Sequence, residues 1–259
     1  MIRIAAAGDI HFDRNSQGKF KPHLENLNQK ADLLLLAGDL TQTGHAEEAN
    51  ILAKELHNSP VPVFAVLGNH DFHTDQVPEV CKILESANVN VLENKTCVVE
   101  VQKSAVGIVG LKGFGGGFMG ACGSDFGEKE MKAFIHHTKI LAHGLHDSLL
   151  AMKTDYKIVL MHYSPIPGTL TGEKKEIYPF LGSYLFAEAI DAAGADIVFH
   201  GHAHRGIEKG VTPGGIPVRN VAQPVIRHIF NIYTLNKEGI VSHSSHSPQN
   251  SGPNVALNF

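Results

Sequence analysis

The sequence has few cysteines, no tryptophan and no long apolar run. Its 259 residues include three cysteines, without the paired spacing of zinc fingers or redox motifs. This odd, scattered set favours free thiols in a reducing compartment over disulfides. No apolar run approaches the ~20 residues of a membrane-spanning helix, and the first residues lack the basic, apolar and small-residue succession of a signal peptide. We therefore expect a cytoplasmic protein that does not bind membranes.

The chain also has no large excess of either charge. Its 22 lysines and arginines against 26 aspartates and glutamates leave a formal net charge of −4. Without a basic excess, no long-range field recruits nucleic acid, which argues against nucleic acid as a partner. Hydrophobic residues make up 43% of the chain, enough for a large core and too many for a disordered protein. The unusually frequent residue is histidine, with 17 copies.

Short apolar runs alternate with longer amphipathic stretches, a pattern typical of a layered α/β fold. The first three apolar runs each end at a glycine that polar residues follow, as expected of buried strands. The pattern predicts strands over 2–7, 32–37, 61–67, 98–101, 105–111, 156–161, 196–199, 217–221, 229–235 and 240–242, and helices over 46–57, 128–152 and 181–193. We expect one domain over residues 1–243 and a tail rich in Ser, Asn and Pro over residues 244–259.

Side chains that bind metals follow five of the predicted strands, at the point where each strand ends. They are Asp9-Ile10-His11, Gly38-Asp39, Gly68-Asn69-His70-Asp71, His162 and Gly201-His202-Ala203-His204. A single Asp or Asn after a strand is usually a turn residue, but turn formation does not explain the histidines. Ligands gather at the carboxyl ends of strands in α/β sheets, so we expect these groups to converge. Imidazole and carboxylate donors without thiolates suit Mn, Fe, Zn, Ni or Co.

In this order the five motifs resemble the calcineurin-like metallophosphoesterase superfamily, whose pattern is DxH, GD, GNH followed by D or E, an isolated His, and GHxH. The resemblance implies a four-layer α/β/β/α sandwich of two mixed β-sheets flanked by helices, with two divalent or mixed-valence transition-metal ions. It implies that one ion is held by Asp9, His11, Asp39 and His204, and the other by Asp39, Asn69, His162 and His202. Asp39 would bridge the two ions. His70 would act beside the leaving group, with Asp71 orienting its ring.

Such a site implies a metal-dependent phosphohydrolase, because two ions stabilise both the entering and the leaving oxygen of an in-line displacement at phosphorus. A metal-bound hydroxide would attack, and His70 would give the departing oxygen a proton or a hydrogen bond. No Asp-Arg pair follows Gly38-Asp39 as in phosphoprotein phosphatases, and Gln42 stands where purple acid phosphatases carry a tyrosine. The Gly-Asp-Leu-Thr and Gly-Asn-His-Asp motifs are instead similar to those of bacterial phosphodiesterases that hydrolyse cyclic nucleotides or glycerophosphodiesters.

We therefore predict a phosphodiesterase that acts on a small phosphoester, with nucleotides among the candidate substrates. A phosphomonoesterase or nucleotide pyrophosphatase of the same fold is an alternative. A non-catalytic protein-binding scaffold is a second alternative, although such scaffolds lose ligands or the catalytic histidine that this chain retains. Residues 113–126, rich in glycine and phenylalanine, are a candidate lid. Phe114, Phe118 and Phe126 would either cover the substrate or dock in the core.

Overall fold

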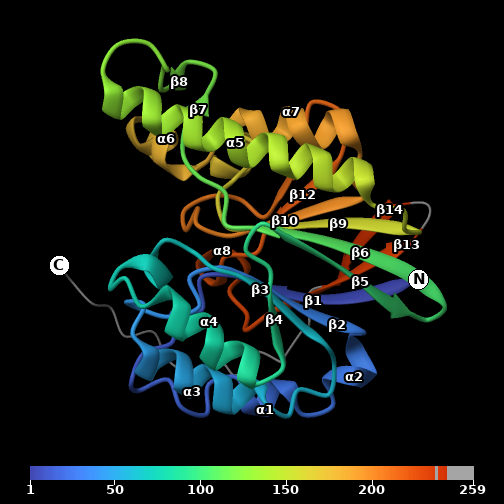
Figure 1. Cartoon of the computed structure of the whole chain (residues 1–259). Helices are drawn as coiled ribbons and strands as arrows, with labels where there is room; N and C mark the ends of the chain where they lie inside the picture. The colour runs from blue at the N-terminus through green and yellow to red at the C-terminus, as the bar shows by residue number, and fades with distance from the viewer. Residues whose placement is uncertain (237–238, 244–259) are drawn as a thin grey trace, which may run out of the picture.

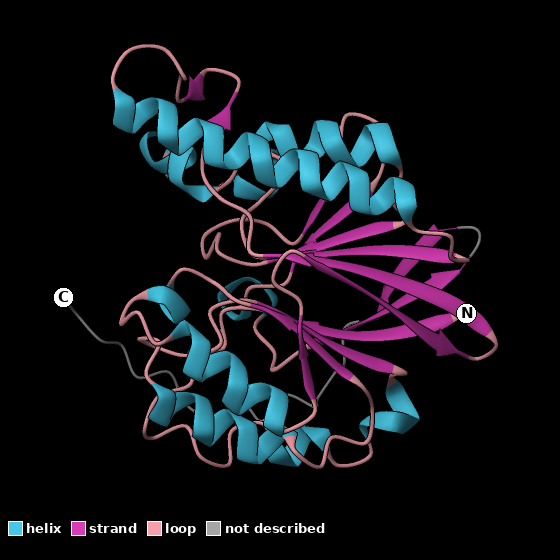
Figure 2. Cartoon of the chain, viewed as in Figure 1, coloured by secondary structure: helices cyan, strands magenta, loops and turns pink. Residues whose placement is uncertain are grey.

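The computed structural model describes residues 1–236 and 239–243, which form four layers (Figures 1 and 2). Two six-stranded mixed sheets lie face to face, and helices cover the outer face of each sheet. This arrangement confirms the four-layer α/β/β/α sandwich. The tail expected over residues 244–259 lies outside the described residues. No helix of the described part of the chain is both long enough and apolar enough to span a membrane.

The first sheet contains the N-terminal strands in the order β14-β13-β1-β2-β3-β4. Its strands β1 to β4 run parallel, and β13 and β14 are antiparallel additions at one side. The bounds are β1 Ile2–Ala7, β2 Leu33–Ala37, β3 Val63–Val66, β4 Val89–Val91, β13 Asn231–Asn236 and β14 Gly239–His243. Four helices pack on its outer face, namely α1 Lys21–Leu24, α2 Leu27–Lys30, α3 Ala46–Leu56 and α4 Val77–Ser86.

The second sheet has the order β11-β12-β10-β9-β6-β5, and its four central strands are parallel. The bounds are β5 Lys95–Val101, β6 Ser104–Leu111, β9 Tyr156–Met161, β10 Ile197–His200, β11 Lys209–Val211 and β12 Pro217–Asn220. Helices α5 (Lys129–Ala151) and α7 (Tyr184–Ala193) cover its outer face. Smaller elements are β7 Gly117–Phe118, β8 Ala121–Cys122, α6 Tyr178–Leu181, α8 Gln223–Ile226 and the 3₁₀ turns His70–Phe72, Gly168–Leu170 and Lys175–Ile177.

The core has three apolar layers, one between the sheets and one between each sheet and its helices. Because successive residues of a strand point to opposite faces, Ile2 and Ile4 of β1 pack between the sheets while Ala5 and Ala7 face the helices. The rings of Phe199 and Tyr233 meet 5.1 Å apart in the middle layer. Both faces of each sheet are therefore buried, which explains why the strands are continuous apolar runs.

The structure confirms every strand and helix predicted above, with bounds that shift by up to three residues. Helix α4 was not predicted, although it has ten residues. It buries only Val80 and Leu84 and begins with Pro78 in its first turn, so its apolar face is too narrow for a clear helical period. Strands β4 and β11 have three residues each, too few for a pattern.

Glycines allow the loops of the two sheets to meet at one edge of the sandwich. The parallel strands bring their carboxyl ends to this edge, where Gly68 lies two residues beyond the end of β3 and Asp39 two residues beyond the end of β2. A Cβ atom on Gly68 would overlap the carboxylate and the backbone nitrogen of Asp39. A Cβ atom on Gly201 would likewise overlap the carboxylate of Asp9. Glycine is therefore required at these two positions by close approach.

We expect the substitution Gly68→Ala to lower the free energy of unfolding by about 1–3 kcal/mol, because the added methyl group displaces Asp39. Gly144→Ala is the matched control. Gly144 lies in α5 where a Cβ atom meets nothing within 4 Å, so alanine should raise stability by about 1 kcal/mol through helix propensity. Urea unfolding measures both variants. A Gly68→Ala protein as stable as the wild type would contradict the packing described here.

Glu93 connects the ends of the two sheets. Its Oε1 accepts a hydrogen bond of 2.7 Å from the backbone N–H of Leu67, just after β3. Its carboxylate also accepts a hydrogen bond from the backbone N–H of Lys112, just after β6. Burial raises the pKa of Glu93 from its usual 4.5 to about 7. This carboxyl group therefore binds a proton more tightly in the folded protein than in the unfolded chain.

The raised pKa of Glu93 predicts a dependence of stability on pH. The contribution of Glu93 to the free energy of unfolding is fully present below pH 4.5, where its carboxyl group is protonated in both states. It is lost as the pH rises through about 7, because the unfolded chain releases the proton at a lower pH than the folded protein does. Over that range we expect the metal-free wild type to lose up to about 3 kcal/mol more stability than Glu93→Gln, whose amide oxygen still accepts the Leu67 hydrogen bond. Urea unfolding at either end of the range tests this. Parallel pH profiles of the two proteins would refute it.

Candidate metal centre

The structure brings all seven predicted ligands together at the edge where the parallel strands end. Asp9, His11, Asp39 and His204 form one group whose potential ligand atoms all lie within 4.8 Å of one another. Asp39, His162 and His202 form a second group by the same measure, so Asp39 belongs to both. Asn69 joins the second group, because its Oδ1 lies 3.0 Å from Nε2 of His162. The two sets correspond to the division expected from the sequence.

Asp9 is buried and surrounded by donors. The backbone N–H of His202 donates to both carboxylate oxygens, at 3.1 and 2.9 Å, and His204 Nε2 lies 2.8 Å from Oδ1. Burial by itself would raise the pKa of Asp9, but the His204 hydrogen bond and the neighbouring histidines outweigh it and lower the pKa to about 2. The same hydrogen bond raises the pKa of His204. Asp9 is therefore a permanent negative charge in this site.

Asp39 lies between the two groups. Its Oδ1 is 3.4 Å from His162 Nε2, its Oδ2 is 3.8 Å from His11 Nε2, and the backbone N–H of His70 donates to Oδ1 at 2.8 Å. Burial, and then the negative charge of Asp9, raise the pKa of Asp39 to about 6. Two carboxylates buried this close repel each other unless a positive charge lies between them. A divalent cation would supply that charge.

Two imidazoles in the second group are fixed in one tautomer. His162 Nδ1 lies 2.9 Å from the carbonyl oxygen of Ala37, and His202 Nε2 lies 3.0 Å from that of Phe180. A carbonyl oxygen only accepts, so these nitrogens carry the hydrogen and leave His162 Nε2 and His202 Nδ1 with free lone pairs. Burial lowers the pKa of His162, and it lowers that of His202 to about 4. Neutral imidazoles held in this way are the form that ligates metals.

The contact between His162 and Asn69 tests whether a cation fits. With the hydrogen of His162 on Nδ1, its Nε2 faces the side-chain oxygen of Asn69 at 3.0 Å, and neither atom has a hydrogen for the other. Two lone pairs aimed at one point repel each other, whereas a metal ion that accepts both removes the conflict. The donor set, imidazole nitrogens with carboxylate and amide oxygens, is also one that transition metals bind. The residues present therefore fit metal ions.

Backbone strain is concentrated at the same residues. Asp9, His11, Asp39 and His202 have positive φ angles of 54°, 44°, 47° and 70°. The left-handed region costs a residue with a side chain about 1–2 kcal/mol, so such residues persist where the surrounding structure holds them. Here the sharp turn after each strand keeps the carboxylate or imidazole at the edge of the sheet. No pattern in the sequence indicates these angles, since four non-glycine residues adopt them.

His70 is held by a backbone carbonyl. Its Nδ1 lies 2.7 Å from the carbonyl oxygen of Gln42, and its Nε2 lies 4.0 Å from Asp39 Oδ2. The expectation that Asp71 orients this ring is therefore wrong. The buried Asp71 carboxylate instead accepts hydrogen bonds from the backbone N–H groups of Leu40, Thr41 and Gly68 and from the Thr41 hydroxyl. Both carboxylate oxygens of Asp71 are occupied by these hydrogen bonds. Asp71 therefore connects the loop after β2 to the loop after β3.

Backbone carbonyls and one aromatic ring are the parts of the site that the sequence did not reveal. The carbonyls of Ala37, Gln42 and Phe180 fix three imidazoles, and any residue type can supply a carbonyl. The ring of Tyr163 lies 4.4 Å from that of His202 and supports it from one side. The sequence feature that could have indicated Tyr163 is its position directly after the predicted ligand His162.

The glycine-rich segment over residues 113–126 is attached to α6 by its backbone. The N–H groups of Gly116 and Gly117 donate to the carbonyls of Pro179 and Gly182, both at 2.7 Å. Phe118 is buried in the small cluster beneath it, whereas Phe126 is 87% exposed. Phe118 is thus docked in the core, one of the two alternatives expected, whereas Phe126 is not. The function of this segment as a lid stays a prediction.

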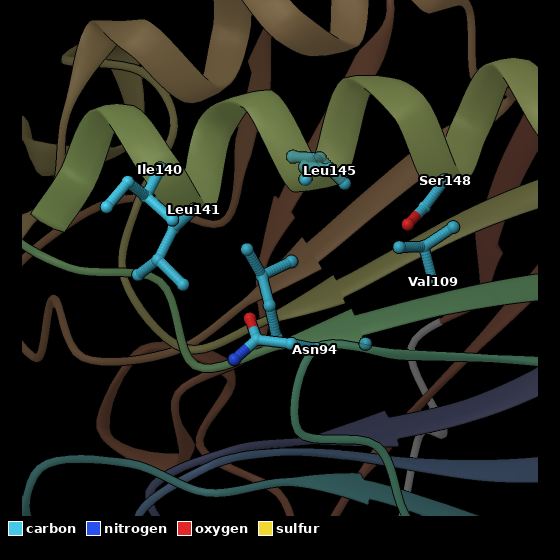
Figure 3. A pocket seen from close by; sticks show the side chains of 9 residues that line it. Asn94, Val109, Ile140, Leu141, Leu145 and Ser148 are labelled. Atoms are coloured by element: carbon cyan, nitrogen blue, oxygen red, sulfur yellow. The ribbon is translucent and has the colours of Figure 1, made fainter.

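A cavity of about 280 Å³ lies apart from this site, between α5 and β6 (Figure 3). Ile140, Leu141 and Leu145 of α5 and Val109 of β6 line it, with Asn94 at one side. None of its lining residues belongs to the two ligand groups. It is a gap under the long helix and is separate from the candidate centre.

Comparison with solved structures finds the same fold in distant proteins. A phosphopantetheinyl hydrolase from Mycobacterium tuberculosis is 13% identical, with a TM-score of 0.63 over 96% of this chain and 98% of that one. The protein TT1561 of Thermus thermophilus is 16% identical, with a TM-score of 0.58 over 93% of this chain and 98% of that one. A putative 5′-nucleotidase from Staphylococcus aureus is 16% identical, with a TM-score of 0.56 over 94% of this chain and 53% of that one. Likeness at such low identity shows the fold alone.

Comparison of sequences gives the family. No curated protein matches the chain. The sequence profile of the calcineurin-like phosphoesterases, however, matches residues 2–206, which include every residue of the two ligand groups. A cluster of histidine and aspartate ligands is typical of the dinuclear members of this family. With both the profile and the metal-binding cluster in place, the chain belongs to the calcineurin-like phosphoesterase family and is a metal-dependent phosphoesterase.

Proposed function

We propose that the protein is a phosphodiesterase that uses two divalent or mixed-valence transition-metal ions to hydrolyse a small phosphoester. The observation that carries this proposal is the convergence of two histidine and aspartate groups on the shared carboxylate of Asp39. One ion would be held by Asp9, His11, Asp39 and His204, and the other by Asp39, Asn69, His162 and His202. These donors suit Mn, Fe, Zn, Ni or Co alike.

Two such ions would act as Lewis acids on the phosphoryl oxygens and activate a water molecule for attack on phosphorus. His70 is the residue of the chain that would give the departing oxygen a proton or a hydrogen bond. In the imidazolium form, its Nδ1–H remains bonded to the Gln42 carbonyl while its Nε2–H is free for the departing oxygen. Asp71 has a structural part in this scheme, because it holds the loops that carry Asp39 and His70.

Two features support a diester as the substrate. No arginine follows Asp39, and Thr41, two residues on, uses its hydroxyl to bind Asp71 rather than facing the site. The second metal-ligand motif therefore adds no side-chain cation for the extra charge of a monoester dianion. A non-catalytic scaffold is the weaker alternative, because the chain keeps the complete ligand set and an oriented His70. The cytoplasmic location expected from the sequence stays a prediction.

Supplied with Mn²⁺, the purified protein should cleave bis-p-nitrophenyl phosphate faster than p-nitrophenyl phosphate. His70→Ala should lower kcat for the diester by roughly 10²–10⁴-fold and leave the metal content unchanged, because His70 acts on the leaving group without being a ligand. Steady-state kinetics combined with elemental analysis of the same samples measures both effects. His73→Ala, which changes a nearby exposed histidine, is the control and should retain turnover.

Faster cleavage of the monoester would overturn the proposed substrate class while leaving the metal centre intact. Retained turnover in His70→Ala would remove the acid role from that residue. Absence of turnover with both esters and with cyclic nucleotides, in a protein that holds its metals, would favour the scaffold alternative.

A further inference from the structure

Lys112 lies beside the candidate metal centre and has no part in the function proposed so far. It follows β6, which is the parallel neighbour of β9. The backbone N–H groups of His162 and Tyr163 both donate to its carbonyl oxygen at 3.0 Å. Its backbone is thus fixed to the segment that carries a predicted ligand.

Three aromatic rings surround the ammonium group of Lys112. Its Nζ lies 4.8 Å from the ring centre of Phe72, 5.0 Å from that of Phe114 and 5.2 Å from that of Tyr163. Phe72 belongs to the same 3₁₀ turn as His70, and Tyr163 packs against His202. The ammonium group therefore lies between the two loops that flank the predicted second ion. Faces of aromatic rings attract cations, whereas burial lowers the pKa of Lys112 below its usual 10.5.

Acidic groups attract Lys112 without pairing with it. Among residues 1–236 and 239–243, the Lys112 ammonium group makes no hydrogen bond and no ion pair. Glu93 and Asp39 attract it without forming an ion pair, and the Glu93 carboxylate already accepts the backbone hydrogen bonds of Leu67 and Lys112 itself. Aromatic rings stabilise a cation without using its N–H groups. Lys112 therefore has donors available for an anion beside the metal centre.

We propose that Lys112 binds a second anionic oxygen group of the substrate, distinct from the phosphoryl group that is hydrolysed. This inference rests on the proposed function, since it places that group beside the same metal centre. The phosphoryl group of a diester carries one negative charge, which the two ions match without help. A cation held beside the centre then selects substrates with an additional phosphate or carboxylate. Lys112 would determine specificity and take no part in bond cleavage.

Binding of phosphomonoesters, which are not the proposed diester substrate, to the manganese-loaded protein tests the proposal through affinity instead of activity. The three probes are glycerol 3-phosphate, 3-phosphoglycerate, which adds a carboxylate, and glycerol 1,3-bisphosphate, which adds a phosphate. By isothermal titration calorimetry we expect the wild type to bind at least one of the two-anion probes about tenfold more tightly than glycerol 3-phosphate, as a charge-assisted contact would provide. The probe that gains affinity identifies the second group as phosphate or carboxylate.

In Lys112→Met the tenfold difference should disappear, and in Lys112→Arg it should persist. Lys30→Met, which removes an exposed lysine from α2 on the outer helical layer, is the control for the loss of one charge and should keep the difference. Equal weakening of all three probes in Lys112→Met, or no change, would overturn the proposal. Failure of the wild type to bind glycerol 3-phosphate would instead count against the metal centre, and with it against any anion site beside it.

Discussion

The carboxylate of Asp39 is the group on which the arrangement of the site depends. It belongs to both ligand groups, and its pKa is raised to about 6 because it is buried next to Asp9. The fold accepts this unfavourable pair at the edge where the parallel strands of both sheets end. Gly68 approaches Asp39 so closely that no side chain fits there, and the N–H of His70 donates to it. Such a carboxylate is stabilised by a cation, which is why its position implies a metal-binding function.

Buried acids maintain the loops around Asp39. Asp71 joins the loop after β2 to the loop after β3, and Glu93 joins the end of β3 to the end of β6. Both use backbone N–H groups as donors, so they fix the course of the chain rather than a single side chain. The left-handed turn at Asp39 directly precedes Leu40 and Thr41, which donate to Asp71, and the left-handed His202 donates its N–H to the Asp9 carboxylate. The site is thus a set of strained loops held by hydrogen bonds to buried carboxylates.

Much of this architecture could be predicted from the sequence. The strands were visible because both faces of each sheet are buried, and the ligands were visible because five strands end in Asp, Asn or His at the same edge. Hydrogen bonds of backbone groups could not be predicted, because any residue type can make them. This is why the Gln42 carbonyl was missed and the orientation of His70 was assigned to Asp71. Lys112 was missed because its aromatic neighbours come from three separate segments.

The central claim is that Asp39 holds two metal ions at once. Equilibrium dialysis against Mn²⁺, followed by elemental analysis, tests it most directly. We expect about two ions per chain in the wild type, fewer than about one in Asp39→Asn, and about two in Asp125→Asn, which changes an exposed acid paired with Lys139. Loss of both ions in Asp39→Asn would establish that Asp39 is the ligand the two ions share. A wild type that binds no manganese, or an Asp39→Asn protein that still binds two ions, would contradict the claim.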